Sequence, residues 1–152
     1  LFSGGLQRNE LQLREVMNKI TTAVGPSLYQ KRIALLGLAF KEGTNDVRHS
    51  LSLRLYRLLR DQGASVVGHD VLAIEEVSEL EPEMEASTDL DGVLSDAEVV
   101  VVLNSEAVYA TIDWVGYGSS ERKPYIIDTL GTLDAKSLVE SGLIFDLLGS
   151  SG

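Results

Sequence analysis

The sequence predicts a three-layer α/β fold, a doubly wound and mainly parallel sheet that follows an N-terminal helix. Three uninterrupted apolar runs, at 33–36, 99–103 and 125–127, indicate strands that are covered on both faces, as in a parallel sheet. Helical patterns and glycines separate these runs, so strands and helices alternate along the chain. Right-handed crossovers between such strands build a doubly wound sheet. The 152 residues are enough for one domain with its own core.

The first two helices are predicted from apolar residues at helical spacing. The stripe of the first helix, over 6–23, consists of Leu13, Val16, Met17, Ile20 and Val24. Gly25 and Pro26 indicate its end. The second helix has the core stripe Leu51, Leu55, Leu58 and Leu59, and Gly63 is placed as its C-terminal cap.

The remaining elements follow in the same alternation. A short strand at 66–67 ends at His69 and Asp70. Further helices are expected at 73–80, 89–94, 106–114 and 134–140, the last capped by Gly142, and further strands at 84–87 and, at an edge, 144–148. The glycine and serine content of 116–123 predicts a surface loop. In this architecture ligands bind at the loops after the strands, which follow Leu36, Val67, Leu103 and Ile127.

Charge is distributed unevenly along the chain. With 13 basic and 23 acidic residues the net charge is −10, which argues against nucleic acid or an anionic membrane as the main partner. Residues 31–60 nevertheless hold seven basic and two acidic side chains, whereas 70–98 holds eleven acidic and no basic ones. This basic segment is compatible with a small anionic ligand. A solvated surface of mixed charge would also account for most of these side chains.

The sequence has neither cysteine nor a long apolar run, which excludes several kinds of site and a membrane-spanning helix. The chain has no cysteine, which excludes disulfides, thiolate metal sites and covalent catalysis by a cysteine of this chain. The sequence has no apolar run of the roughly 20 residues that a membrane helix needs. Residues 1–5 do not resemble a signal peptide, so we expect a cytoplasmic location.

The loop after the first strand, residues 37–50, does not match the common phosphate-binding motifs. A dinucleotide loop requires G-x-G-x-x-G, but Ala39 and Glu42 occupy its second and third glycine positions. The P-loop pattern also fails, because Thr44 rather than lysine follows Gly43. Asp70, at the end of the next strand, could otherwise pass for the acid that binds a ribose. A free-standing dinucleotide-binding domain is therefore disfavoured.

Three side chains of this loop suit a nucleotide-like anion. The ring of Phe40 offers an apolar surface, and Lys41 and Arg48 offer cations for phosphate or carboxylate oxygens. The amino end of the next helix adds partial positive charge. The alternative is structural: Phe40 fills the core, while Lys41 and Arg48 pair with Glu42 and Asp46.

Other candidate residues are better explained by structure. His49 and His69 are the only histidines, and no second imidazole stands at ligand spacing, so we predict no metal site. Ser50 is predicted to cap the second helix rather than to act as a nucleophile. Tyr109 and Trp114 are predicted to pack in the core.

The loop also carries a family resemblance. The signature consists of LGLAFK at 36–41, Thr44, DVR at 46–48 and Ser50. It resembles the opening of the C-terminal domain of the UDP-glucose/GDP-mannose dehydrogenase family, and further matches continue over about residues 31–149. Residues 8–10 resemble the end of the central helical region of the family. The resemblance implies a connecting helix from this dimerising region at 1–30 and a nucleotide-sugar-binding α/β domain at 31–149.

The resemblance also implies a function. Members are NAD-dependent enzymes that oxidise a nucleotide sugar to a uronate through a thiohemiacetal on a cysteine. This chain lacks that cysteine and the dinucleotide loop, so it resembles the substrate-side part of such an enzyme. Its implied partners are a nucleoside diphosphate sugar, the N-terminal NAD domain of the same protein and a second copy of the chain. By position, Phe40 and Lys41 would contact the nucleotide sugar, and Arg48 would reach the NAD cofactor.

Departures from the family pattern keep a second hypothesis open. Leu51 stands where proline is common, His49 where an acidic residue is usual, and Leu130 within the segment where many members have a basic residue. The alternative is a catalytically silent binding or interaction module that keeps the fold. The base and sugar preferred, and dimerisation through Leu13, Met17 and Ile20, are not determined by the sequence.

Overall fold

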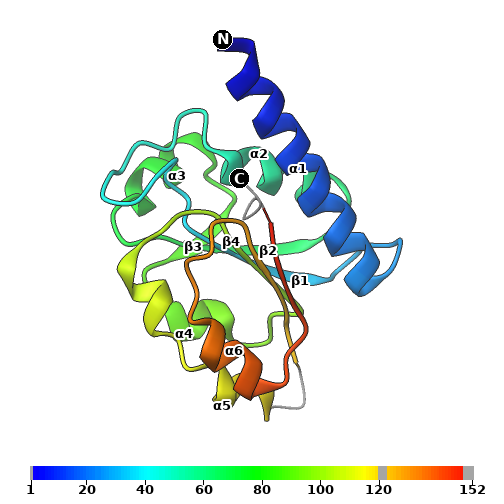
Figure 1. The fold of residues 1–152 in the computed structure, drawn as a ribbon. Coiled ribbons are helices and arrows are strands. Elements are labelled where there is room, and N and C mark those ends of the chain that lie inside the picture. Colours follow the sequence, from blue (N-terminus) through cyan, green and yellow to red (C-terminus); the bar gives the residue numbers. More distant parts are fainter. Residues whose placement is uncertain (1, 120–122, 149–152) are drawn as a thin grey trace.

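The computed structural model describes residues 2–119 and 123–148, with side chains from residue 10 onward. Six parallel strands form one sheet in the order β3-β2-β1-β4-β5-β6. Helices cover both faces, which confirms the predicted three-layer α/β fold (Figure 1). The strands are β1 (Arg32–Leu36), β2 (Ser65–His69), β3 (Glu85–Ser87), β4 (Val99–Val102), β5 (Tyr125–Asp128) and β6 (Phe145–Leu147).

Each face of the sheet has its own core. One core lies under α1 (Phe2–Val24), α2 (Leu51–Asp61) and α3 (Ile74–Leu80). The other lies under α4 (Leu90–Leu94), α5 (Trp114–Gly118) and α6 (Ala135–Ser141). The central strands β1 and β4 alternate their side chains between these cores, so almost every position must be apolar. This double coverage explains why these two strands are unbroken apolar runs.

The long helix α1 packs against the first core. Leu13, Val16 and Ile20 are buried there, and Met17 packs beside them. The face that includes Leu13, Met17 and Ile20 is therefore covered by this chain's own sheet layer. The helix N-terminal half extends beyond the sheet (Figure 1). The division into a connecting helix at 1–30 and a nucleotide-sugar-binding domain at 31–149 stays a prediction.

Two predictions of local structure are wrong. The helix predicted over 106–114 is a short 3-10 helix, η1 (Ala107–Thr111), after which Ile112 is extended. Helix α5 then starts within the predicted helix and continues into the predicted loop, because the Asp113 carboxylate accepts a hydrogen bond from Val115 N at 3.1 Å. A glycine is needed at 118, since a Cβ there would lie 2.1 Å from the carbonyl oxygen of Ser141.

Helix α2 is turned slightly from the predicted orientation. Leu55, Tyr56 and Leu59 form the buried face, whereas Leu58 is 39% exposed and lies at its edge. The predicted cap is confirmed: Gly63 has a φ of +85° directly after the C-cap residue Gln62. Among the described helices, none has an apolar segment of the length required to cross a membrane.

Candidate functional site

A cavity of about 340 Å³ opens at the carboxyl ends of β1, β4 and β5. The strand order reverses between β1 and β4, and ligands of doubly wound sheets bind at such a reversal. The loop after β1, the segments after β4 and β5, and helix α1 contribute the walls, which consist of Gln12, Phe40, Lys41, Glu42, His49, Leu51, Leu103, Asn104, Ser105, Thr129 and Leu130.

Phe40 and Lys41 lie together in the wall of this cavity. The Phe40 side chain is 50% exposed, so the alternative in which it fills the core is wrong. Lys41 Nζ lies 5.5 Å from the centre of the Phe40 ring, a cation–π contact. In the described part of the chain, no carboxylate forms an ion pair with Lys41. An apolar ring and a cation therefore lie side by side in the wall of this cavity.

Arg48 lies elsewhere. Its side chain is 77% exposed and forms an ion pair with Asp46, with Nε 3.1 Å from Oδ1. The hydrogen bonds from Arg48 lower the pKa of Asp46 below its ordinary value. Arg48 lines a separate cavity of about 470 Å³ next to α3, so the structure does not bring it to Phe40 and Lys41. The pairing of Arg48 with Asp46 is the part of the structural alternative that the geometry confirms.

Asp70 holds the loop that carries Phe40. Its buried carboxylate accepts hydrogen bonds at Oδ2 from Leu38 N and Ala39 N, at 2.8 and 2.9 Å. Its other oxygen accepts from Leu72 N and Ala73 N, at 2.9 and 3.0 Å. Asp70 is thus fully engaged by backbone and is not available for a ribose. The loop amides that would face a pyrophosphate in a dinucleotide site are used internally.

Ser50 fixes the other end of the same loop. Its hydroxyl accepts hydrogen bonds from Ser52 N at 3.0 Å and Leu53 N at 3.4 Å, which confirms the predicted helix cap. The same hydroxyl donates to the carbonyl oxygen of Leu38 at 2.7 Å. His49, directly before it, has a φ of +62° and lines the cavity. The loop is therefore anchored at both ends while its middle stays exposed.

The position of Asn104, in the wall of the cavity, depends on its close approach to Gly37. This residue has a φ of +98°, and a Cβ there would lie 2.4 Å from Cγ of Asn104. Any other residue would displace Asn104. The loops after β4 and β5 were predicted to bind ligands, but Asn104, Ser105 and Thr129 were not predicted as ligand contacts. Their position directly after buried strands was the available signal.

The second histidine is structural. His69 is buried, with Nδ1 2.8 Å from Tyr109 Oη and Nε2 3.2 Å from the carbonyl oxygen of Thr88. Burial lowers the pKa of His69, although the Thr88 carbonyl and nearby carboxylates partly oppose this shift. Tyr109 and Trp114 are both fully buried, as predicted.

The lowered pKa of His69 predicts pH-dependent stability. The His69 imidazole binds a proton more readily in the unfolded chain than in the folded one. The free energy of unfolding should therefore be highest above about pH 6.5, the pKa of an unfolded histidine, and should fall as the pH drops below that value. Urea denaturation between pH 5 and 8 measures this slope. His69→Asn should remove it between pH 5 and 6.5, whereas His49→Asn, at an exposed position with positive φ, should retain it. Equal slopes in all three proteins would contradict the prediction.

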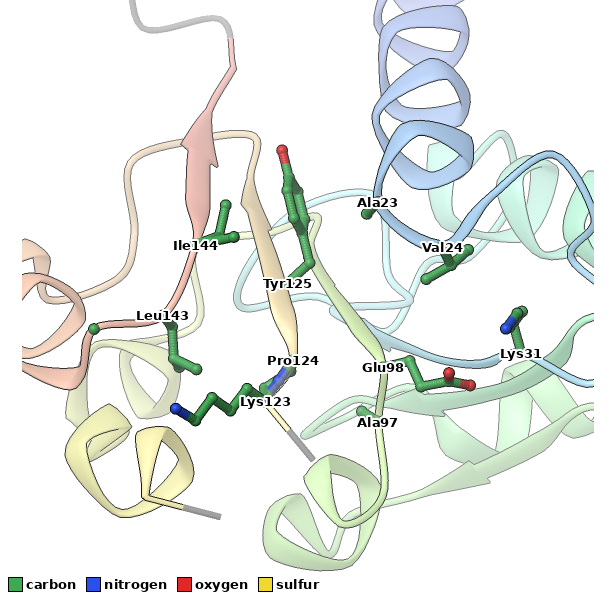
Figure 2. A pocket seen from close by; sticks show the side chains of 11 residues that line it. Ala23, Val24, Lys31, Ala97, Glu98, Lys123, Pro124, Tyr125, Leu143 and Ile144 are labelled. Carbon is green, nitrogen blue, oxygen red and sulfur yellow. The ribbon is translucent and has the colours of Figure 1, made fainter. Parts of the chain in front are cut away.

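A larger cavity, of about 730 Å³, lies at the opposite edge of the sheet. Figure 2 shows its lining side chains, which come from the end of α1, from the segments before the strands, including Lys31 and Glu98, and from Tyr125 at the start of β5. Glu98 is already engaged, because one carboxylate oxygen accepts a hydrogen bond from Arg32 N at 2.9 Å. Since doubly wound sheets bind ligands at the carboxyl ends of strands, the smaller cavity is the better candidate site.

Comparisons with known proteins agree with this fold. A family model described as UDP-glucose/GDP-mannose dehydrogenase family, UDP binding domain, matches residues 34–135. UDP-glucose 6-dehydrogenase TuaD of Bacillus subtilis is 29% identical over 150 residues, which cover 98% of this chain and 32% of that protein. UDP-glucose 6-dehydrogenase AglM of Haloferax volcanii is 39% identical over 83 residues, 55% of this chain and 19% of that protein.

Solved structures show the same similarity. A UDP-glucose dehydrogenase from the archaeon Pyrobaculum islandicum aligns with a TM-score of 0.75 and 27% identity, covering 93% of this chain and 30% of that one. The chain thus spans about a third of the length of TuaD. Since the family model matches well over half of the residues, this chain belongs to the UDP-glucose/GDP-mannose dehydrogenase family and contains its UDP binding domain.

Proposed function

We propose that this chain binds a nucleoside diphosphate sugar as the C-terminal, substrate-holding domain of an NAD-dependent nucleotide-sugar 6-dehydrogenase, which oxidises an alcohol to a uronate. The observation that carries the proposal is the pair formed by Phe40 and Lys41. Both side chains are exposed, and they contact each other in a cavity where the strand order reverses. Family membership supports the same conclusion.

The cavity offers a different contact for each part of such a ligand. Lys41 supplies a positive charge for the diphosphate. The Phe40 ring supplies an apolar surface against which a base or sugar ring can lie. Ser105 and Thr129 supply hydroxyls, which suit hydrogen bonding to a sugar. Binding at this edge would let the domain help to close a cleft and exclude water from the reacting alcohol.

The described residues do not form a site for the whole NAD cofactor. The amides of Leu38 and Ala39, at the place of a dinucleotide loop, donate to Asp70 instead. We therefore propose that NAD is bound mainly by the N-terminal domain of the full-length protein. Arg48 is the proposed contact of this chain with NAD, because its guanidinium is largely exposed on the loop surface. A homodimer and the cytoplasmic location remain predictions.

One observation favours the second candidate, a catalytically silent module. Leu130 is half exposed and lines the cavity, at the segment where the resemblance leads us to expect a basic residue. The site then has fewer cations for a diphosphate than the family pattern implies. A ligand-binding measurement distinguishes the two candidates.

Calorimetric titration of the 152-residue chain with UDP, GDP, UDP-glucose and GDP-mannose tests the proposed function. We expect saturable binding of at least one diphosphate or its sugar. The corresponding nucleoside, uridine or guanosine, should bind about tenfold more weakly, because it lacks the charge that Lys41 contacts. Absence of saturable binding at millimolar concentrations of all four ligands would favour the silent module.

A further inference from the structure

Asn104 is the most deeply buried polar side chain in the wall of the 340 Å³ cavity. It follows β4 and Leu103, and it is 1% exposed. Its amide oxygen accepts a hydrogen bond from Glu106 N at 3.3 Å. Its amide nitrogen has no hydrogen-bond partner among the residues that the structure describes. The amide oxygen of Asn104 therefore has a hydrogen-bond partner, and its amide nitrogen has none among the described residues.

An unpaired buried donor needs a physical explanation. Leaving such a group without an acceptor is destabilising, and folded proteins pair the great majority of buried polar groups. Within the described part of the chain, the other unpaired buried side-chain atom is Nε1 of Trp114. Trp114 lies in the core on the other face of the sheet and lines none of the cavities described above. Asn104 differs because it stands in the wall of the candidate site.

We propose that Asn104 is a ligand-binding residue whose Nδ2 donates a hydrogen bond to an oxygen of the bound nucleotide sugar. This inference rests on the proposed function and deepens it by naming a further group that recognises the ligand. The oxygen belongs either to the nucleoside diphosphate or to the hexose, and both offer the same acceptor chemistry.

The local geometry allows the amide to serve a ligand. The absence of a side chain at Gly37 lets Asn104, in the segment after β4, pack against the start of the loop after β1. Its hydrogen bond from Glu106 N, at 3.3 Å, is slightly longer than the usual range, and the terminal torsion of asparagine is broad. Reorienting the amide toward a ligand would therefore cost one weak hydrogen bond.

Thr129, directly after β5, offers a hydrogen-bond acceptor near the Asn104 donor. Its hydroxyl donates to the carbonyl oxygen of Val102 at 2.6 Å, so the lone pairs of Oγ1 remain available to accept a hydrogen bond. Both residues line the same cavity. A sugar hydroxyl is both donor and acceptor, so it can accept from Asn104 and donate to Thr129.

Calorimetric titration with UDP and with UDP-glucose, on the wild-type chain and three variants, tests the proposal. Asn104→Ala should raise Kd about fivefold by removing one hydrogen bond. Asn104→Asp keeps the shape but repels a ligand oxygen, so its Kd should rise further. Asn18→Ala, the same substitution at an exposed position of α1, should change Kd less than twofold. The thermal midpoint of Asn104→Ala should fall only slightly, because the variant loses one weak hydrogen bond from Glu106 N but also removes an unpaired buried donor.

The two ligands identify the oxygen. Equal weakening for UDP and UDP-glucose places it on the nucleoside diphosphate, and weakening for UDP-glucose alone places it on the hexose. Folded Asn104 variants that bind both ligands as the wild type does would overturn the inference and leave the proposed function intact. A wild-type chain that binds no diphosphate nucleotide or nucleotide sugar would overturn both. If Asn104→Ala does not fold, Asn104→Asp and the shift of the Asn104 carboxamide proton signals on titration decide the question.

Discussion

Replacing Asp70 by asparagine is expected to lower the free energy of unfolding by about 3 kcal/mol. The buried Asp70 carboxylate accepts four backbone hydrogen bonds, two from the loop after β1 and two from the segment after β2. Asparagine keeps one acceptor oxygen. Its NH2 group replaces the other oxygen and, being a donor, cannot accept hydrogen bonds from the two backbone N–H groups there. Urea denaturation followed by the fluorescence of Trp114, the single and fully buried tryptophan, measures the effect.

The matched control for this substitution is Asp96→Asn. Asp96 is exposed and has a φ of +65°, a conformation that asparagine tolerates well. The control removes the same charge but no buried hydrogen bond, so its stability should stay within about 0.5 kcal/mol of the wild type. Similar stabilities for Asp70→Asn and the wild type would show that Asp70 does not hold the loop.

Reversing the charge of Lys41 is expected to have the largest effect on ligand binding. Lys41→Glu replaces a cation near the diphosphate with an anion, and we expect Kd for UDP to rise at least tenfold, roughly 1.4 kcal/mol or more. Lys41→Ala removes the charge without reversing it and should cause a smaller loss. The difference between wild type and Lys41→Glu should shrink as salt is raised, because ions screen an exposed charge. Calorimetry at two salt concentrations measures both effects.

Lys136→Glu controls for the change in net charge. Lys136 is exposed on α6, which packs on the face of the sheet opposite α1 and α2. It does not line the 340 Å³ cavity. It changes the total charge by the same amount and should leave Kd nearly unchanged. An equal loss of affinity in both reversals would assign the effect to the overall charge of the protein rather than to Lys41.

Features governed by local chemistry could be predicted from the sequence. The apolar runs of β1 and β4 arise because helices cover both faces of the sheet. Ser50 could be recognised as a helix cap because its hydroxyl bonds to backbone only two and three residues away. The αL cap at Gly142 follows from the same local rules. Phe40 and Lys41 could be predicted as candidate ligand contacts because they follow the end of the first strand, and both line the cavity there.

Features that depend on distant contacts could not be predicted. Asn104 is placed by its packing against Gly37, and no pattern near either residue encodes that contact. Asp70 resembles a ribose-binding acid in sequence, and only the fold shows that four amides engage its carboxylate. Arg48 was expected near Lys41, but its ion pair with Asp46 holds it beside a different cavity.

Mapping amide chemical shifts during a titration with UDP-glucose tests the central claim, that the ligand binds at the carboxyl ends of the strands. We predict that the largest shifts occur at Phe40, Lys41 and Asn104, around the 340 Å³ cavity. Shifts confined to Lys31, Glu98 and Tyr125, around the larger cavity at the amino ends, would contradict the account.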